Sequence, residues 1–151
     1  MFYKKWWAAA VAVALVVVVT GANYGCVSTS APRVEPGDGG EWGVYSVKLY
    51  YDIPDDNGVA IYELYYDSAG NQTRQENYGV DGRLVANIGG VAIYEFEYDG
   101  AGNMTRREHY GVDGRLVANG VAIYEWEYDS AGNVVETRTY DAQGRRRSVN
   151  Y

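Results

Sequence analysis

Three copies of one sequence pattern occupy most of the chain from Val59 to Asn150. The copies begin with Val-Ala-Ile-Tyr-Glu at Val59, Val91 and Val121, at intervals of 32 and 30 residues. Each copy reaches a Tyr-Asp pair and then a Gly-Asn pair, and 12 residues after the first of these tyrosines comes another. A fixed period of this length is typical of repeat proteins, in which each unit buries its apolar face against its neighbours. The pattern therefore predicts a repeat architecture.

Each copy also carries the period of a β-strand. In the segment 92–98 small and aromatic residues occupy the even positions, while Ile93 and two glutamates occupy the odd positions. The segment 99–103 fits a three-residue hairpin loop in which Gly102 takes the left-handed conformation, and a return strand follows over 103–110. The expected cross-strand pairs are Tyr98 with Met104, Phe96 with Arg106, Glu95 with Arg107 and Ala92 with Tyr110.

A further glycine turn and a short strand over 115–118 lead into the next copy. Because all of these connections are short, the predicted fold class is all-β, an antiparallel β-hairpin meander or repeat array after an N-terminal apolar signal helix. The predicted organisation is a signal peptide over 1–25, a flexible tether over 26–41 and a YD-like β-repeat domain over 42–151, with units of about 42–58, 59–90, 91–120 and 121–151. The tether is rich in Ser, Thr, Pro and Gly, a composition typical of spacers.

The front of the chain carries the features of a secretion signal. Lys4 and Lys5 precede an apolar run of 14 residues, 6–19, which fits a signal-peptide core better than the roughly 20 residues of a membrane span. Cys26 is the only cysteine and follows a glycine just beyond this run, an arrangement that resembles a bacterial lipoprotein signal. We therefore expect lipidation at Cys26. Cleavage after Ala22, giving a secreted product, and an uncleaved anchor are the alternatives.

The charge of the predicted mature chain limits its partners. Removal of 1–25 takes away two lysines and no acid, which leaves 11 basic and 20 acidic residues and a formal charge of −9. Contact with phosphates needs a basic surface, so nucleic acid is not an expected partner. We expect membrane contact only through the N-terminal lipid anchor. The expected location is the bacterial cell envelope, facing the periplasm or the exterior, with secretion as the alternative.

The repeated pattern Tyr-Asp-x-x-Gly-Asn, with Tyr-(Asp/Gly)-x-x-Gly-Arg in the linked half, resembles the YD-repeat or Rhs family. The residues that carry the resemblance are 98–103, 128–133 and 140–145, and the likeness spans roughly 43–147. In large members of that family the repeats wind into a β-sheet shell around a toxin or another C-terminal domain. Three or four units are too few to close such a shell, and the family's self-cleavage motif is absent. The resemblance thus implies a β architecture and a surface or secreted setting, but no toxin activity.

Few residues suggest catalysis or metal binding. The only histidine, His109, stands where the other copies have Asn77 and Thr139, and a lone histidine on a strand is usually not catalytic. The recurring aspartates are expected as turn residues. Asp52, Asp55, Asp56 and Asn57 offer oxygen ligands for Ca²⁺ but lack the spacing of an EF-hand, so an ordinary acidic turn is favoured. We expect no enzyme, no cofactor and no metal.

Aromatic residues leave two interpretations open. Tyr62, Tyr94 and Tyr124 recur at one position, and Leu64, Phe96 and Trp126 recur at another. The favoured interpretation is a core ladder in which each ring packs on the equivalent ring of the next unit. The alternative is an exposed binding surface of Tyr62, Tyr94, Tyr124 and Trp126, together with the repeat-breaking residues Arg107 and His109.

Three functional hypotheses follow. The first is a non-enzymatic, envelope-tethered or secreted β-repeat protein that acts as a structural or protein-interaction module. The second is a carbohydrate or cell-wall binding module that uses exposed aromatic rows. The third is a remnant or accessory of a Rhs-type toxin or secretion locus. The expected partners are an envelope protein or a cell-wall glycan, and open sheet edges also allow self-association.

Overall fold

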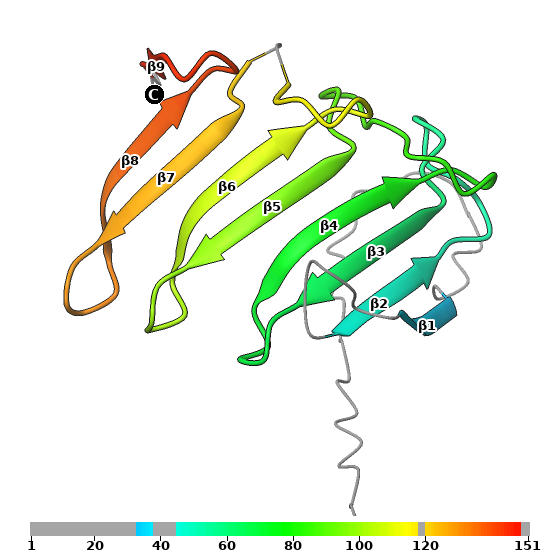
Figure 1. Ribbon diagram of the computed structural model, residues 1–151, viewed down its shortest axis with the longest axis horizontal. Coiled ribbons are helices and arrows are strands. Elements are labelled where there is room, and N and C mark those ends of the chain that lie inside the picture. Colours follow the sequence, from blue (N-terminus) through cyan, green and yellow to red (C-terminus); the bar gives the residue numbers. More distant parts are fainter. Residues whose placement is uncertain (1–32, 38–44, 118–119, 149–151) are drawn as a thin grey trace, which may run out of the picture.

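The structure, a computed structural model, describes residues 33–37, 45–117 and 120–148 (Figure 1). The strands in these ranges are β1 (Arg33–Gly37), β2 (Tyr45–Tyr50), β3 (Ile61–Tyr66), β4 (Gln72–Tyr78), β5 (Ile93–Tyr98), β6 (Met104–Tyr110), β7 (Ile123–Tyr128), β8 (Val134–Tyr140) and β9 (Arg146–Arg147). They form one sheet of nine strands in which each strand pairs antiparallel with the next along the chain. The predicted all-β meander is confirmed.

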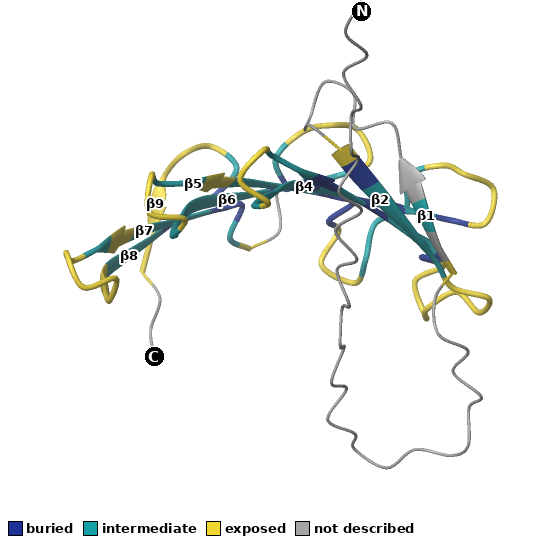
Figure 2. Cartoon of the chain, turned by 90° about the horizontal axis from the view of Figure 1, so that it is seen from below, coloured by how far each residue is buried: buried dark blue, intermediate teal, exposed yellow. Residues whose placement is uncertain are grey.

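The sheet is a single curved layer, which Figure 2 shows close to edge-on. The described residues form no second layer over either face, and they include no helix of the length and apolar character needed to cross a bilayer. The predicted signal helix and the predicted lipidation site, Cys26, lie outside the described residues.

Part of the predicted tether belongs to the sheet. Residues Arg33–Gly37 form β1, in which Glu35 lies opposite Lys48 of β2. An edge strand tolerates Pro36, which has no amide N–H to donate. The prediction of a flexible segment over 26–41 is therefore wrong for these five residues. Composition alone does not reveal the pairing that such a strand gains from an existing neighbour.

The hairpins turn through the same five-residue loop. In the loop 99–103 the N–H of Asp99 donates to the Asn103 carbonyl, and the N–H of Gly102 donates to the Asp99 carbonyl, both at 3.0 Å. Gly102 has a φ of +85°, in the left-handed region that favours glycine. The Asp99 carboxylate accepts the N–H groups of Ala101 and Asn103 at 2.9 Å, and the flanking hairpins repeat these bonds. The predicted role of the recurring aspartates as turn residues is confirmed.

A β-bulge changes the register of the hairpins. The structure pairs Tyr98 with Met104, Glu97 with Arg106, Phe96 with Arg107, Glu95 with Glu108 and Ile93 with Tyr110. Only the first of the four predicted pairs is therefore confirmed. The other three are wrong by one residue, because the register shifts between Glu97 and Tyr98. One extra residue leaves the alternation of both strands intact, so the sequence pattern did not reveal it.

The predicted short strand over 115–118 shrinks to one bridge. Leu116 pairs with Tyr110, and Leu84 pairs with Tyr78 in the preceding unit. The N–H of Val117 donates to the His109 carbonyl at 3.0 Å, so this loop folds back onto the end of β6.

The apolar core lies at the start of each repeat. Val91, Ala92 and Ile93 are 5%, 0% and 5% exposed, respectively. One cluster joins Val91, Val117, Ala122 and Ile123, with Tyr94, Leu116, Tyr140 and Ala142 packed around them. Burial of a valine or isoleucine side chain contributes roughly 1.5–3 kcal/mol. The Val-Ala-Ile motif thus supplies the apolar core.

The predicted aromatic core ladder is wrong. Tyr62, Tyr94 and Tyr124 are only partly buried. His109 lies between the last two, with ring centroids 5.1 Å from Tyr94 and 5.4 Å from Tyr124. Tyr94 faces His109 across the β5–β6 ladder, which places the imidazole where the next tyrosine was expected. Equivalent rings therefore do not stack on one another.

Candidate functional site

The strands place their glutamates on one side of the sheet and the rings of Tyr94, Phe96, Tyr124 and Trp126 on the other, while Tyr65, Tyr78, Tyr110 and Tyr140 lie among the glutamates. Successive side chains of a strand point to opposite faces, and the register assigns each position to one side. The charged face carries, from β2 to β8, Lys48, Glu63, Arg74, Glu76, Glu95, Glu97, Arg106, Glu108, Glu125, Glu127, Glu136 and Arg138. The opposite side, the aromatic face, carries Tyr62, Leu64, Gln75, Asn77, Tyr94, Phe96, Arg107, His109, Tyr124, Trp126, Thr137 and Thr139. Within these described strands, Arg107 is the one formally charged side chain on the aromatic face.

Four rings of the aromatic face form two stacked pairs. Tyr94 and Phe96 of β5 have ring centroids 6.3 Å apart and planes inclined by 12°. Tyr124 and Trp126 of β7 have centroids 5.7 Å apart and planes inclined by 9°. All four rings remain partly exposed. We call these four residues the ring platform.

Arg107 of β6 lies over the β7 half of the ring platform. Its guanidinium carbon is 4.5 Å from the ring centroid of Tyr124 and 5.8 Å from that of Trp126, which are cation–π distances. Its Nε is buried with no hydrogen-bond partner among the described residues. The three other arginines of β4 to β8 all form ion pairs with glutamates, whereas Arg107 forms none within the described part of the chain. Gln75 and Thr137 occupy the equivalent positions, so this cation occurs in one repeat only.

His109 lies inside this group of rings. It is 9% exposed, and burial together with the charge of Arg107 lowers its pKa, although a hydrogen bond with the Val121 backbone opposes the shift. Its Nε2 has no hydrogen-bond partner among the described residues. The described residues also contain no group of three His, Cys, Asp or Glu side chains arranged to hold a metal ion. The imidazole thus fills space between the two halves of the ring platform.

The structure brings together five of the six predicted binding residues. The sixth, Tyr62, contacts a different ring, that of Tyr51, with centroids 5.6 Å apart and planes at 81°. Burial, followed by the nearby Asp55, raises the pKa of Tyr62. Phe96 was not among the predicted binding residues, yet it completes the ring platform. Phe96 occupies the same position of the repeat as Trp126, and this equivalence could have predicted its place in the ring platform.

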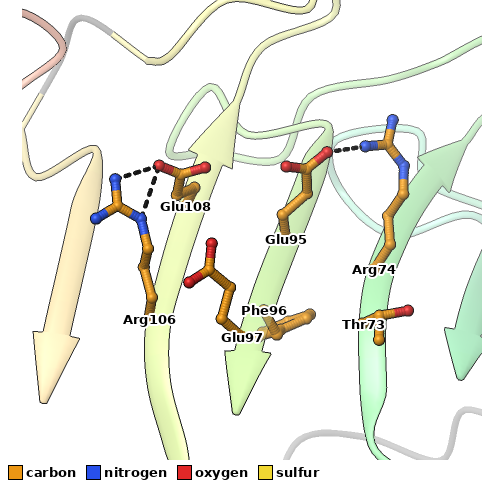
Figure 3. A pocket seen from close by; sticks show the side chains of 7 residues that line it. All are labelled: Thr73, Arg74, Glu95, Phe96, Glu97, Arg106 and Glu108. Atoms are coloured by element: carbon orange, nitrogen blue, oxygen red, sulfur yellow. Dashed lines mark hydrogen bonds and ion pairs between the residues drawn. The ribbon is translucent and has the colours of Figure 1, made fainter. Parts of the chain in front are cut away.

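On the charged face, arginines join neighbouring hairpins. Arg74 of β4 binds Glu76 of its own strand at 2.8 Å and also binds Glu95 of the next hairpin. Arg106 repeats this arrangement one hairpin later, and Figure 3 shows one ion pair from each arginine. The expected register paired Glu95 with Arg107, which lies on the opposite side of the sheet, and therefore did not predict this network.

A hollow of about 180 Å³ opens where the ladder between β4 and β5 ends (Figure 3). Its lining residues are Thr73, Arg74, Glu95, Phe96, Glu97, Arg106 and Glu108. Burial disfavours the ionised form of Glu108, but hydrogen bonds from Tyr110 and Arg106 outweigh it and lower the pKa of that carboxyl group. A carboxylate held ionised in this way is poorly suited to proton transfer at neutral pH. The hollow is therefore best described as part of the junction between hairpins.

The segment 52–57, which offered a weak candidate site for Ca²⁺, contains a turn. The Asp55 carboxylate accepts the N–H groups of Asn57 at 2.8 Å and Val59 at 3.0 Å, and Gly58 has a φ of +86°. These are the bonds that Asp99 makes in its own loop, so the turn chemistry accounts for Asp55. Asp52, Asp56 and Asn57 are exposed.

No protein-family model, curated protein or solved structure gives a significant match to this chain.

Proposed function

We propose that this protein is a non-enzymatic interaction module whose contact surface is the ring platform with Arg107. The single observation that supports this function is the separation of the two faces. On the charged face each basic side chain binds at least one glutamate, whereas on the aromatic face four rings stay partly exposed around Arg107, which has no ion pair within the described residues. Partly exposed aromatic rings and arginine are the side chains that most often dominate binding interfaces.

The proposed setting is the cell envelope. It rests on the sequence of residues 1–25 and on Cys26, as described above. In this setting the β-repeat domain would present its aromatic face to envelope components, and the resemblance to YD repeats agrees with a surface or secreted role.

A cell-wall glycan is the second candidate partner, and the partly exposed rings of Tyr94 and Phe96 favour it. Sugar rings bind aromatic side chains by stacking their apolar faces on the ring, and this β5 half of the ring platform lies beside the half that Arg107 covers. Quaternary amines fit less well, because the guanidinium of Arg107 already occupies the cation–π positions over Tyr124 and Trp126.

The proposal predicts that Arg107→Gln weakens binding to the natural partner. The substitution installs the residue of the equivalent position, Gln75, and therefore suits the local backbone. Arg83→Gln, in an exposed loop, removes the same charge elsewhere and serves as the control. Truncation of an arginine that anchors a binding surface costs about 2 kcal/mol or more, which is roughly thirtyfold in Kd.

Binding should be measured against purified peptidoglycan and against an envelope protein extract. Weaker binding of Arg107→Gln with unchanged binding of Arg83→Gln is the expected result. Equal binding by both variants and the unmodified protein would show that the aromatic face is not the contact surface. Retention on peptidoglycan alone would select the glycan, and retention from the extract alone would select a protein partner.

A further inference from the structure

The guanidinium of Arg107 has no acceptor on its own side of the sheet. It lies over the rings of Tyr124 and Trp126, and its Nε is buried with no hydrogen-bond partner among the described residues. An arginine that stacks on aromatic rings still presents its N–H groups in the plane of the guanidinium, in a fork that matches a carboxylate. The glutamates of β3 to β8 point to the opposite side. Arg107 can therefore donate to one carboxylate of a ligand.

The β5 half of the ring platform lies next to this cation. Phe96 is directly opposite Arg107 in the β5–β6 ladder, and Tyr94 is directly opposite His109. Directly opposite side chains of neighbouring strands have Cβ atoms about 4.5–5.5 Å apart. The rings of Tyr94 and Phe96 are both partly exposed. A ligand of one or two rings that contacts Phe96 therefore also reaches Arg107.

Neutral polar side chains border the ring platform. Gln75 of β4 lies opposite Tyr94, and Thr137 of β8 lies opposite Trp126. Both are partly exposed, and neither carries a charge. Amide and hydroxyl groups donate to and accept from the hydroxyl groups of a sugar. Aromatic rings, one cation and neutral polar groups thus lie together on the aromatic face.

The central strands favour a saccharide over an extended peptide as the ligand. β5, β6 and β7 each pair with a strand on both sides. A peptide that binds as an added strand needs a sheet edge with free N–H and carbonyl groups. The ring platform lies away from both edges of the sheet, so it contacts a ligand through side chains.

We propose that the ring platform binds an acidic saccharide, with a sugar ring on Tyr94 and Phe96 and a carboxylate on Arg107. The assignment rests on the function proposed above and narrows its glycan candidate to sugars that carry a carboxylate. Such sugars include uronic acids and the lactyl ethers of cell-wall glycan strands. A hydrogen bond between two charged groups is stronger than one between neutral groups, so the carboxylate determines the preference among sugars.

The test compares two acidic saccharides with their methyl esters, which keep the sugar rings and lose the charge. The probes are cell-wall glycan strands freed of their peptides and oligogalacturonate. Calorimetry gives the affinity, and the ring resonances of His109, the only histidine, report contact near Tyr94, 5.1 Å away. At least one free acid should bind roughly tenfold or more tightly than its ester. The acid that binds more tightly identifies the source of the carboxylate.

Variants of Arg107 assign the preference to this side chain. Arg107→Gln should bind the acid as weakly as the unmodified protein binds the ester, and Arg107→Lys should keep part of the preference because it retains the charge. Arg83→Gln, the matched control, should bind like the unmodified protein. Equal urea midpoints show that a variant changes binding and not folding. If Arg107→Gln unfolds, the comparison of acid with ester decides alone.

Two results would overturn the assignment. Equal binding of acid and ester would remove the carboxylate but leave the ring platform as a glycan-binding surface. Binding of no probe would remove the acidic saccharide altogether. In that case, weaker retention of an envelope protein by Arg107→Gln would still support the proposed interaction module, so the two proposals fail separately.

Discussion

At the scale of single residues, the backbone conformation at each turn position determines whether a glycine is needed for stability. Gly102 has a φ of +85°, and a Cβ added there would meet only the Asn71 side-chain oxygen, at 3.9 Å. Its conformation, and not lack of space, therefore demands glycine. Gly100 in the same loop has no positive φ and no neighbour within 4 Å of an added Cβ.

We predict that Gly102→Ala destabilises the sheet and that Gly100→Ala does not. A non-glycine residue in the left-handed region costs roughly 1–2 kcal/mol. Urea unfolding of both variants measures the difference. Equal midpoints for the two would mean that the loop relaxes to another turn type.

Arg107 and His109 could be predicted as candidate binding residues because they differ from the equivalent residues of the other repeats. Both break the repeat, and both lie in the group of rings described above. The sequence could not show that Arg107 stacks on Tyr124, because that contact depends on the register between β6 and β7.

At the scale of the element, the hairpin is stabilised by its aspartate turn. Hydrogen bonds from Asn103 and from loop N–H groups lower the pKa of the Asp99 carboxyl group, and Asp67 and Asp129 behave in the same way. A carboxyl group with a lowered pKa in the folded state contributes stability above its unfolded pKa. This contribution is lost as the pH falls through the folded pKa.

We therefore predict that the protein loses stability below a pH of about 4, the usual pKa of aspartate. Asp99→Asn should weaken this pH dependence without breaking the turn. Asn87 already makes the equivalent bonds in its own loop, to the N–H groups of Gly89 at 2.9 Å and Val91 at 3.2 Å. Thermal unfolding from pH 7 to pH 2 compares the two proteins, and identical pH profiles would contradict the role assigned to Asp99.

At the scale of the whole molecule, the charged face carries ion pairs and hydrogen bonds among glutamates, arginines and tyrosine hydroxyl groups. The Tyr110 hydroxyl donates to Glu108 at 2.6 Å, and the Tyr65 hydroxyl donates to Glu76 at 3.1 Å. Burial, followed by the adjacent glutamates, raises the pKa of Tyr65, Tyr78 and Tyr110. A group with a raised folded pKa stabilises the fold below its unfolded pKa and ceases to do so as the pH rises.

We predict that the sheet becomes less stable above a pH of about 10, where tyrosines ionise in the unfolded chain. Tyr110→Phe removes one titrating hydroxyl and should reduce the slope of stability against pH in this range. The same substitution should lower stability at pH 7 by roughly 1.5–3 kcal/mol, the usual value of a hydrogen bond to a charged group. Urea unfolding at pH 7 and at pH 10.5 tests both statements.

The sequence by itself determined the hairpins. The Val-Ala-Ile motif, the alternation of the strands and the aspartate–glycine loops act locally, so each copy specifies the same antiparallel unit and the same turn. Local chemistry was also enough to identify the recurring aspartates as turn residues.

The tertiary structure alone decided which face each arginine occupies. A one-residue bulge moves the partner of Phe96 from Arg106 to Arg107, and side chains alternate across a strand. That shift places Arg106 among the glutamates of neighbouring hairpins and Arg107 over the ring platform. The edge strand β1 and the pairing of Glu136 with Arg146 were likewise set by strands brought together in space, which no local pattern encodes.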